Sequence, residues 1–299
     1  MGQEWRIDMK SVGIVTDSHS SISIDVAKEL GIYVLPMPFY FEEECYYEEV
    51  SITRKEFFER MNDGATVTTS QPSPESVMEI WRECLKECEE ILYMPISSGL
   101  SGACGVATML ATEEEFEDKV YVVDNGRVST PMHRSIMDAI ELIDEGYKAK
   151  EIKYILENSK DDMSIYIAVE TLEYLKKGGR VTPATAAIGS VLNIKPILKL
   201  STGVLDSFKK CRGMKKARRE MLEAMKEDMQ VRFKESYDKG EIYLLAATSA
   251  DEETTKGWIE EIEEYFPGMK VLCDNLSLGI SCHTGEGALG IGCSCKPRR

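Results

Sequence analysis

Short apolar runs separated by segments of helical periodicity fill the first half of the chain. SVGIVTDS (11–18) is apolar until it ends in small polar residues, which is typical of a buried parallel strand. EILYMPIS (90–97) and KVYVVDN (119–125) are further runs of this kind. A later segment places Ile136 and Ile140 on one face of an amphipathic helix. This alternation predicts a mostly parallel sheet with helices on both faces.

Local signals mark where helices of this half begin. Thr53 and Glu56 have the spacing of a capping box, and Ser73 followed by Pro74 is typical of an N-cap and a first helical position. The stretch IYVLPMPFYF (32–41) is extended in pattern, but proline cannot donate a hydrogen bond to a sheet. Its two prolines therefore predict an edge or irregular strand.

The second half has a different pattern. SIYIAVE (164–170) is a strand, and two runs separated by Ser201-Thr202-Gly203 predict a β-hairpin. A long charged helix follows over about 213–236, and then a strand, a helix and a strand. We therefore expect an α/β protein of two domains. Residues 1–163 form a doubly wound, mostly parallel sheet domain, and residues 164–299 form an α/β domain that contains the hairpin.

Composition and charge narrow the class of protein. The chain has 299 residues, of which 43% are hydrophobic and 29% charged, as in soluble globular proteins. A net charge of −16 argues against a nucleic-acid-binding protein, which would carry a basic surface. No stretch approaches the ~20 apolar residues of a membrane span, and the first residues lack the apolar core of a signal peptide. We expect a cytoplasmic protein without stable membrane insertion.

Nine cysteines, an odd number without an export signal, favour reduced thiols over a disulfide framework. Cys282, Cys293 and Cys295 gather near the C-terminus but lack the paired CxxC spacing of a structural zinc site. We expect such cysteines to be buried as small apolar side chains, and we expect no metal. The sequence assigns no further function to this group.

The segment HTGEGALGIG (283–292) contains the GxGxxG spacing of a dinucleotide-binding loop in Gly285, Gly287 and Gly290. That motif needs a helix and a second strand after it, and only nine residues follow Gly290. The pattern therefore favours a glycine-rich turn that lets the chain approach another group closely. A GxxxxGK[ST] phosphate loop is absent from the sequence, which argues against ATP binding by that route.

Small and hydroxyl residues follow the predicted strands at the ends where ligands bind in open α/β sheets. Asp17 and Ser18 follow the first strand, TTSQPSP (68–74) precedes a helix, and ISSGLSG (96–102) joins a strand to a helix. Each stretch also suits turn formation and helix capping, so function and local structure both remain open for it. His283 is flanked by glycines, which leave little else for its ring to pack around.

Together, seven stretches in chain order resemble the DegV family, the fatty-acid-binding proteins of bacteria. Singly each is weak, but they span nearly the whole chain. The stretches are TDS (16–18), TSQPS (69–73), ISSGLSG (96–102), TLEYLKKGGRV (171–181), LNIKPIL (192–198), RGMKKA (212–217) and HTGEGALG (283–290).

The resemblance implies that one long-chain fatty acid is buried between the two domains, and that no cofactor is needed. Members of one branch present the acyl carboxylate to a separate kinase, which phosphorylates it with ATP. The fold is also similar to that of dihydroxyacetone kinases, but without their ATP machinery. Three functions therefore remain open: the lipid-binding subunit of a two-component acyl kinase, a self-sufficient phosphotransferase, and a carrier or sensor without a kinase.

The resemblance also carries residue assignments. Thr69 and a serine of ISSGLSG, either Ser98 or Ser101, are similar to the hydroxyls that hold the carboxylate, together with His283. Arg180 and Arg212 match charged positions around the head group or for work with the kinase. The glycines are expected to let the loop of His283 close over the carboxylate. Support from the surrounding loops is expected from Asp17, Ser18, Gly285 and Gly287.

Two departures from the family pattern stand out. The family tends to show a serine and alternating glycines after the third strand, where this chain reads Ser129-Thr130-Pro131-Met132. The proline usual in the last loop is Glu286 here, which would add negative charge near an acylate site. We therefore expect a different backbone near the first position, and at the second the sequence supports lipid binding more strongly than coupling to a kinase.

Overall fold

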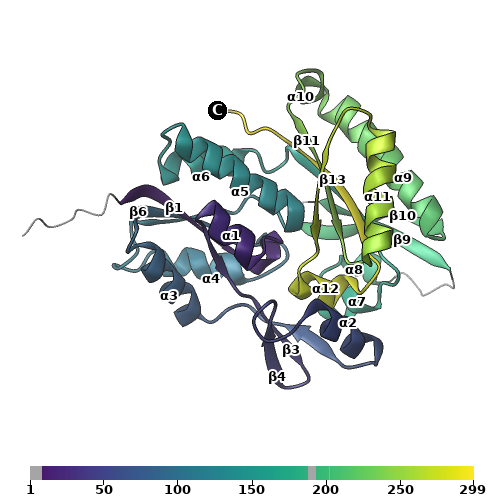
Figure 1. Cartoon of the computed structure of the whole chain (residues 1–299), viewed down its shortest axis with the longest axis horizontal. Helices are drawn as coiled ribbons and strands as arrows, with labels where there is room; N and C mark the ends of the chain where they lie inside the picture. The colour runs from purple at the N-terminus through teal and green to yellow at the C-terminus, as the bar shows by residue number, and fades with distance from the viewer. Residues whose placement is uncertain (1–8, 188–192, 202) are drawn as a thin grey trace, which may run out of the picture.

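A parallel sheet and a mixed sheet lie side by side in the computed structural model, which describes residues 9–187, 193–201 and 203–299 (Figure 1). The first half of the chain forms the parallel sheet in the strand order β2-β1-β6-β7. Its strands are β1 (Lys10–Asp17), β2 (Tyr33–Leu35), β6 (Cys88–Met94) and β7 (Val120–Val122).

Helices cover both faces of this sheet. On one face, Val12 and Ile14 pack in a cluster with Ile136. On the other, Val15 packs in a cluster with the fully buried Trp81. The doubly wound arrangement expected from the alternating pattern is therefore confirmed. The first face is covered by α1 (Ile24–Leu30), α5 (Ser129–Asp144) and α6 (Ala149–Asn158), and the second by α3 (Pro74–Cys84) and α4 (Ala103–Leu110).

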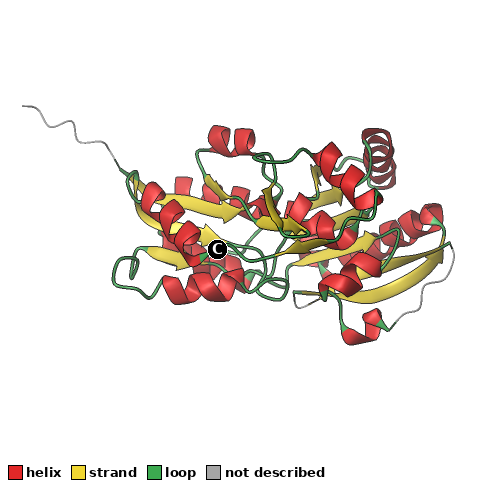
Figure 2. Cartoon of the chain, turned by 90° about the horizontal axis from the view of Figure 1, so that it is seen from below, coloured by secondary structure: helices red, strands yellow, loops and turns green. Residues whose placement is uncertain are grey.

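The second half forms a six-stranded mixed sheet in the order β10-β9-β8-β13-β11-β12. The predicted hairpin is present as the antiparallel pair β9 and β10, and Figure 2 shows the strands of the two large sheets as separate groups. The strands are β8 (Met163–Ala168), β9 (Ile194–Ser201), β10 (Val204–Arg212), β11 (Ile242–Thr248), β12 (Val271–Asn275) and β13 (Leu289–Cys295).

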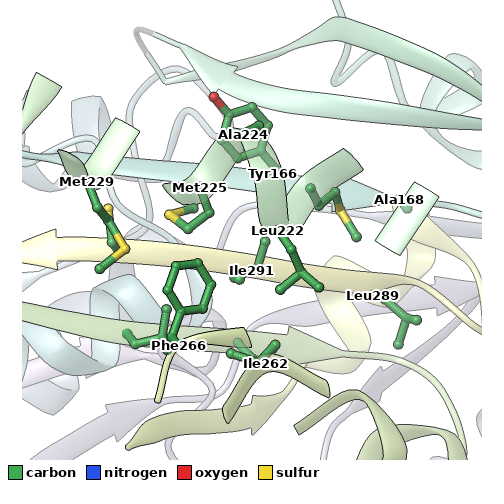
Figure 3. Close-up of a cluster of buried hydrophobic side chains, with 14 of the residues drawn as sticks. Tyr166, Ala168, Leu222, Ala224, Met225, Met229, Ile262, Phe266, Leu289 and Ile291 are labelled. Atoms are coloured by element: carbon green, nitrogen blue, oxygen red, sulfur yellow. The ribbon is translucent and has the colours of Figure 1, made fainter. Parts of the chain in front are cut away.

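Two long helices cover one face of the mixed sheet. These are α9 (Met214–Glu227) and α11 (Glu252–Tyr265), and Figure 3 shows Leu222 and Met225 of α9 beside Ile291 of β13. The other face of this sheet is turned toward the first half of the chain, since Oγ1 of Thr130 in α5 donates a hydrogen bond to the carbonyl of Ala246 in β11.

The charged helix expected over about 213–236 is interrupted. A π-helical turn at Asp228–Arg232 separates α9 from the short α10 (Lys234–Asp238). The carboxylate of Asp228 accepts hydrogen bonds from Ser164, Tyr166 and Lys199 of the mixed sheet. These bonds draw the helix toward the sheet at the turn, which the charge pattern of a helix does not reveal.

A small antiparallel sheet supports the end of the molecule nearest to α12 (Leu278–Thr284). Pro36 divides the extended stretch 32–41 into β2, an edge strand of the parallel sheet, and β3 (Pro38–Phe41) of the small sheet, so the irregular strand is confirmed. Phe39 and Phe57 pack with Leu278 in one apolar cluster. The remaining elements here are β4 (Glu44–Tyr47), β5 (Val67–Thr69), α2 (Arg54–Asn62), α7 (Glu173–Gly178) and α8 (Pro183–Ala186).

The glycine-rich C-terminal segment is a strand in its second part, which the sequence analysis missed. Gly290 lies inside β13, a central strand paired with β8 and β11. Only Gly285 and Gly287 of the three motif glycines have positive φ, at 73° and 80°. The turn expected from the motif is therefore limited to 285–288, because alternating small and apolar residues follow it.

All nine cysteines carry free thiols. Cys282 packs between α12 and the small sheet, while Cys293 and Cys295 face the helices α9 and α11. Burial raises the pKa of all three thiols. Their expected place among buried apolar side chains is confirmed. In the described ranges, no helix is long and apolar enough to cross a membrane.

Candidate functional site

A cavity of about 350 Å³ lies between the two large sheets, a size within the range of small-molecule sites. The mixed sheet provides its apolar floor through β8 and β11, where Ile165, Ile167 and Leu245 point toward the first half of the chain. Ile96 and Leu100 line it from the parallel-sheet side. The cavity is therefore apolar over most of its surface and joins residues that are far apart in sequence.

A polar group at the cavity joins two sequence-predicted residues. Thr69 at the end of β5 and His283 in the last turn of α12 both line the cavity, and their Oγ1 and Nε2 atoms lie 2.9 Å apart. Burial, and then the nearby charge of Arg180, lowers the pKa of His283 to about 4. The imidazole is consequently neutral at neutral pH, and its buried Nδ1 has no hydrogen-bond partner.

A glycine in α7 makes room for this imidazole. A Cβ atom on Gly178 would lie 2.0 Å from Nδ1 of His283, far inside van der Waals contact. Any side chain at residue 178 would therefore displace the ring from Thr69. The sequence shows Gly178 only as the end of a short helix, so its steric function depends on the tertiary structure.

The structure distinguishes the two candidate serines of ISSGLSG. Ser101 lines the cavity, and its Oγ accepts a hydrogen bond from the backbone N–H of Ala103 at 3.2 Å. Ser98 is exposed, and its Oγ donates to Asp124 at 2.6 Å on the outside of the loop. Ser98 is therefore removed from the candidates for carboxylate binding, because its hydroxyl points to a different partner.

Arg180 is the only permanently charged residue among the described residues that line the cavity. Its guanidinium donates to the backbone carbonyls of Gly178 and Leu100, which join the loop after α7 to ISSGLSG. Two of the five guanidinium N–H donors are used in this way, and the others can meet an anion.

Arg212 does not line the cavity. It is exposed at the end of β10 and, with Lys215, Lys216 and Arg219 of α9, lines a separate surface hollow. Of the two functions expected for Arg212, at the head group or in work with the kinase, the first is not supported by this position, because Arg212 does not line the cavity. A position next to glycine in a turn does not reveal which side of the sheet the turn lies on.

Asp17 and Ser18 support the site from behind. Asp17 is fully buried, and its carboxylate accepts from the backbone N–H groups of His19 and Ile96 at 2.9 and 2.8 Å. Ser18 Oγ accepts from the N–H of Met37 at 3.1 Å. Neither residue lines the cavity. Asp17 thus holds the segments that carry His19 and Ile96, both of which do line it.

The glycines of the last loop face away from the cavity. A Cβ on Gly285 would lie 2.8 Å from the ring of Tyr174, and one on Gly287 would lie 3.0 Å from Cγ of Glu170. Asn62 donates to the carboxylate of Glu286 at 2.8 Å, which directs that charge toward α2. Gly285, Glu286 and Gly287 therefore do not line the cavity, and in this structure the loop does not bring the charge of Glu286 to it.

The segment that departs from the family pattern forms the start of α5. Ser129 has a φ of 55°, rare for a residue with a side chain, and its Oγ lies 2.9 Å from that of Ser21. Ser129 and Pro131 line the cavity. The altered sequence therefore shapes one wall of the cavity.

The sequence analysis also missed two cavity residues. His19 lines the cavity, with Nδ1 at 3.2 Å from Asp17, and packs against Gly279 of α12. Gln71 lines the cavity next to Gly102, which begins α4. Both follow strands at the ends where ligands bind in such sheets, and that rule could have drawn attention to them.

This arrangement suits a ligand with a long apolar part and one anionic head. Thr69, Ser101 and Arg180 offer hydroxyl and guanidinium donors at one cavity, and the floor offers only apolar side chains. In residues 9–187, 193–201 and 203–299, no group of three or more His, Cys, Asp or Glu side chains could hold a metal ion.

From the lowered pKa of His283 we predict how the free energy of unfolding depends on pH. The folded protein takes up this proton only near pH 4, whereas the unfolded chain takes it up near pH 6.5. Protonation thus favours unfolding, and the contribution of His283 to the free energy of unfolding is full above about pH 6.5 and falls toward pH 4, by on the order of 3 kcal/mol. Urea denaturation at a series of pH values should show a weaker acid dependence for His283→Gln. An identical dependence in both proteins would contradict the buried, neutral imidazole.

Solved structures share this fold. The structure described as "Fatty Acid Binding of a DegV family Protein from Thermus thermophilus" has a TM-score of 0.83 and 33% identity, and the match covers 95% of this chain and 99% of that one. The structure of "DegV, a fatty acid binding protein from Bacillus subtilis" has a TM-score of 0.82 and 29% identity, with coverage of 96% and 100%.

Sequence relatives agree with the structures. The chain is 32% identical to Protein DegV of Bacillus subtilis (strain 168) over 288 residues, which cover 95% of this chain and 99% of that protein. Residues 11–296 match the family described as "Uncharacterised protein, DegV family". Because this match covers nearly the whole chain, the protein belongs to the DegV family.

Proposed function

We propose that this protein binds a long-chain fatty acid in the cavity between its two large sheets and presents the carboxylate to a separate, ATP-dependent kinase. The observation that carries the proposal is the apolar cavity with Thr69, Ser101, Arg180 and His283 among its few polar lining groups. The names of the related structures from Thermus thermophilus and Bacillus subtilis, which describe fatty acid binding, support it.

The hydrophobic effect favours retention of such a ligand. Burial of about 14 methylene groups at ~0.8 kcal/mol each contributes roughly 11 kcal/mol before the costs of association. Lost translational freedom and ordering of the tail offset part of this gain. The remainder is sufficient for tight binding, so a carrier can shield the tail and still leave the head group near the surface.

In this proposal, the hydroxyl groups of Thr69 and Ser101 donate hydrogen bonds to the carboxylate. The positive charge of Arg180 disfavours a second proton on His283, and the unpartnered Nδ1 is best left as a bare lone pair. With its proton on Nε2, His283 donates to Thr69, whose own O–H is then free for the ligand. Ser101 accepts from Ala103 and also keeps its proton free. Arg180 adds a charge of the required sign.

The kinase part of the proposal rests on the family resemblance and on the absence of a GxxxxGK[ST] loop from the sequence. Arg212, Lys215, Lys216 and Arg219 line a surface area that also holds Glu220, Glu223, Glu261 and Glu264, so this area carries charges of both signs. We propose this area as the contact for the kinase, with Arg180 as the cation nearest to the acylate.

The first test is the lipid content of the protein as purified. We expect denaturing extraction and mass spectrometry to yield a long-chain fatty acid that was not added. Protein that yields none, and that binds no fatty acid after delipidation, would falsify the proposal.

The second test concerns Thr69. Loss of its hydrogen bond to a charged carboxylate costs roughly 1.5–3 kcal/mol, so Thr69→Val should weaken fatty acid binding by about tenfold or more without abolishing it. The neighbouring Thr68 is exposed on the opposite side of β5, and Thr68→Val is the matched control. Equal affinities of the two variants in a titration would show that Thr69 does not hold the head group.

The third test separates fatty acid binding from phosphorylation of the bound fatty acid by the kinase. Arg212→Ala should keep the fatty acid affinity of the unchanged protein and lose most acyl-phosphate formation with ATP and the partner kinase. Lys28→Ala removes an exposed charge from α1 and is the control. If Arg212→Ala supports phosphorylation as well as Lys28→Ala does, the surface around Arg212 is not the kinase contact.

A further inference from the structure

The two faces of β13 differ sharply. Leu289 and Ile291 point into the core beneath α9 and α11, where Figure 3 shows them among large apolar side chains. Gly290 and Gly292 alternate with them and line the cavity on the opposite face. One face of the strand is thus filled by side chains, and the other exposes its backbone to the cavity.

The backbone conformation does not require glycine at these two positions. Gly285 and Gly287 have positive φ, but Gly290 and Gly292 do not. A glycine inside a strand costs stability, because it loses more conformational freedom on folding and has no side chain to pack. Such a residue often marks a place where another group approaches the backbone closely.

Packing within the protein restricts these two glycines less than it restricts others. Elsewhere, glycine makes room for a ring: a Cβ on Gly178 would meet His283 at 2.0 Å, and one on Gly279 would meet His19 at 2.6 Å. For Gly290 and Gly292, the three nearest atoms all belong to the neighbouring strands of the same sheet, at 3.1 Å or more. The space above them belongs to the cavity.

We propose that Gly290 and Gly292 determine which acyl chains the protein accepts, because the tail lies against the bare backbone of β13 and side-chain bulk at these positions limits its length. This inference rests on the proposed function. The glycines form the bottom of a trough whose sides are the residues paired with them. Gly290 lies between Ile167 and Ala247, and Gly292 lies between Ile165 and Leu245.

The trough has a fixed end. The next residue on this face of β13 is Ser294, whose Oγ accepts a hydrogen bond from Arg127. Arg127 is fully buried and also donates to the carbonyl of Ser159 at 3.3 Å. A tail that extended past Gly292 would have to break these buried contacts. At the other glycine, the carbonyl of Gly290 accepts from Trp258 Nε1 at 3.0 Å, which fixes the backbone from the core side.

The experiment is a competition among acyl chains of different length. Delipidated protein is incubated with an equimolar mixture of decanoate, dodecanoate, tetradecanoate, hexadecanoate and octadecanoate, and the bound acids are measured by mass spectrometry. Gly292→Ala and Gly292→Val fill the trough, while Leu245→Ala widens it. Gly105→Val is the matched control, because residue 105 is exposed on α4 with no atom within 4 Å of an added Cβ.

We expect the bound mixture to shift toward shorter acids in Gly292→Ala, and further in Gly292→Val. The ratio of octadecanoate to dodecanoate should fall about fourfold for each methylene group that is excluded. Leu245→Ala should shift the mixture toward longer acids, and Gly105→Val should match the unchanged protein. An added Cβ at residue 292 lies 3.1 Å from the carbonyl oxygen of Ser164, so Gly292→Ala needs only a small shift to fold.

The possible failures are distinguishable. Unchanged protein that binds the mixture, combined with the same chain-length profile in Gly292→Ala and Leu245→Ala, overturns the inference and leaves the proposed function intact. Unchanged protein that binds none of the five acids overturns both. If Gly292→Val does not fold, the opposite shifts expected of Gly292→Ala and Leu245→Ala still decide the matter.

Discussion

A fully buried guanidinium fixes how the two large sheets meet. Arg127 follows β7 of the parallel sheet and donates to Ser294 of β13 in the mixed sheet. Burial lowers the pKa of Arg127, and a buried cation without hydrogen bonds would be very costly. The sheets can therefore approach each other only in a position that supplies its acceptors. Thr130 adds a second fixed point through the carbonyl of Ala246.

The cavity follows from this constraint. The face of the mixed sheet opposite α9 and α11 is covered only in part by helices of its own half, since Leu175 of α7 and Ile280 of α12 pack there and also line the cavity. Side chains from the loops after the parallel strands reach it only at the edges of the cavity. The apolar side chains of the mixed sheet therefore face apolar side chains of the first half across the cavity, and the polar groups lie around Thr69 and Arg180. Such a surface is suited to an acyl tail and would be a poor site for a polar ligand.

The polar groups depend on steric accommodation as much as on hydrogen bonds. His283 can reach Thr69 because Gly178 has no side chain, and His19 can pack on α12 because of Gly279. Asp17 holds the segments on which His19 and Ile96 lie. All of these contacts except that between Asp17 and His19 join elements that are distant in sequence. The site is thus assembled by the packing of α7, α12 and the first loop against one another.

The sequence by itself determined most of the strands and helices and their order. Apolar runs such as 11–18 and 90–97 are long enough and bounded clearly enough to identify parallel strands, and the residues after the second run include Ser101 at the cavity. Local signals also located the capping box of Thr53 and Glu56, because capping depends on neighbours three residues away.

Only the tertiary structure decided which side of each element faces the ligand. It placed Ser98 on the outside of its loop and Arg212 on a distant surface, and it turned Gly285 and Gly287 away from the cavity. It also showed that β13 is a central strand, although its glycines had led the sequence analysis to predict a turn. A residue type and its spacing set the local backbone, but the direction of a side chain relative to another sheet depends on contacts more than 100 residues apart, as between Thr69 and His283 or Arg127 and Ser294.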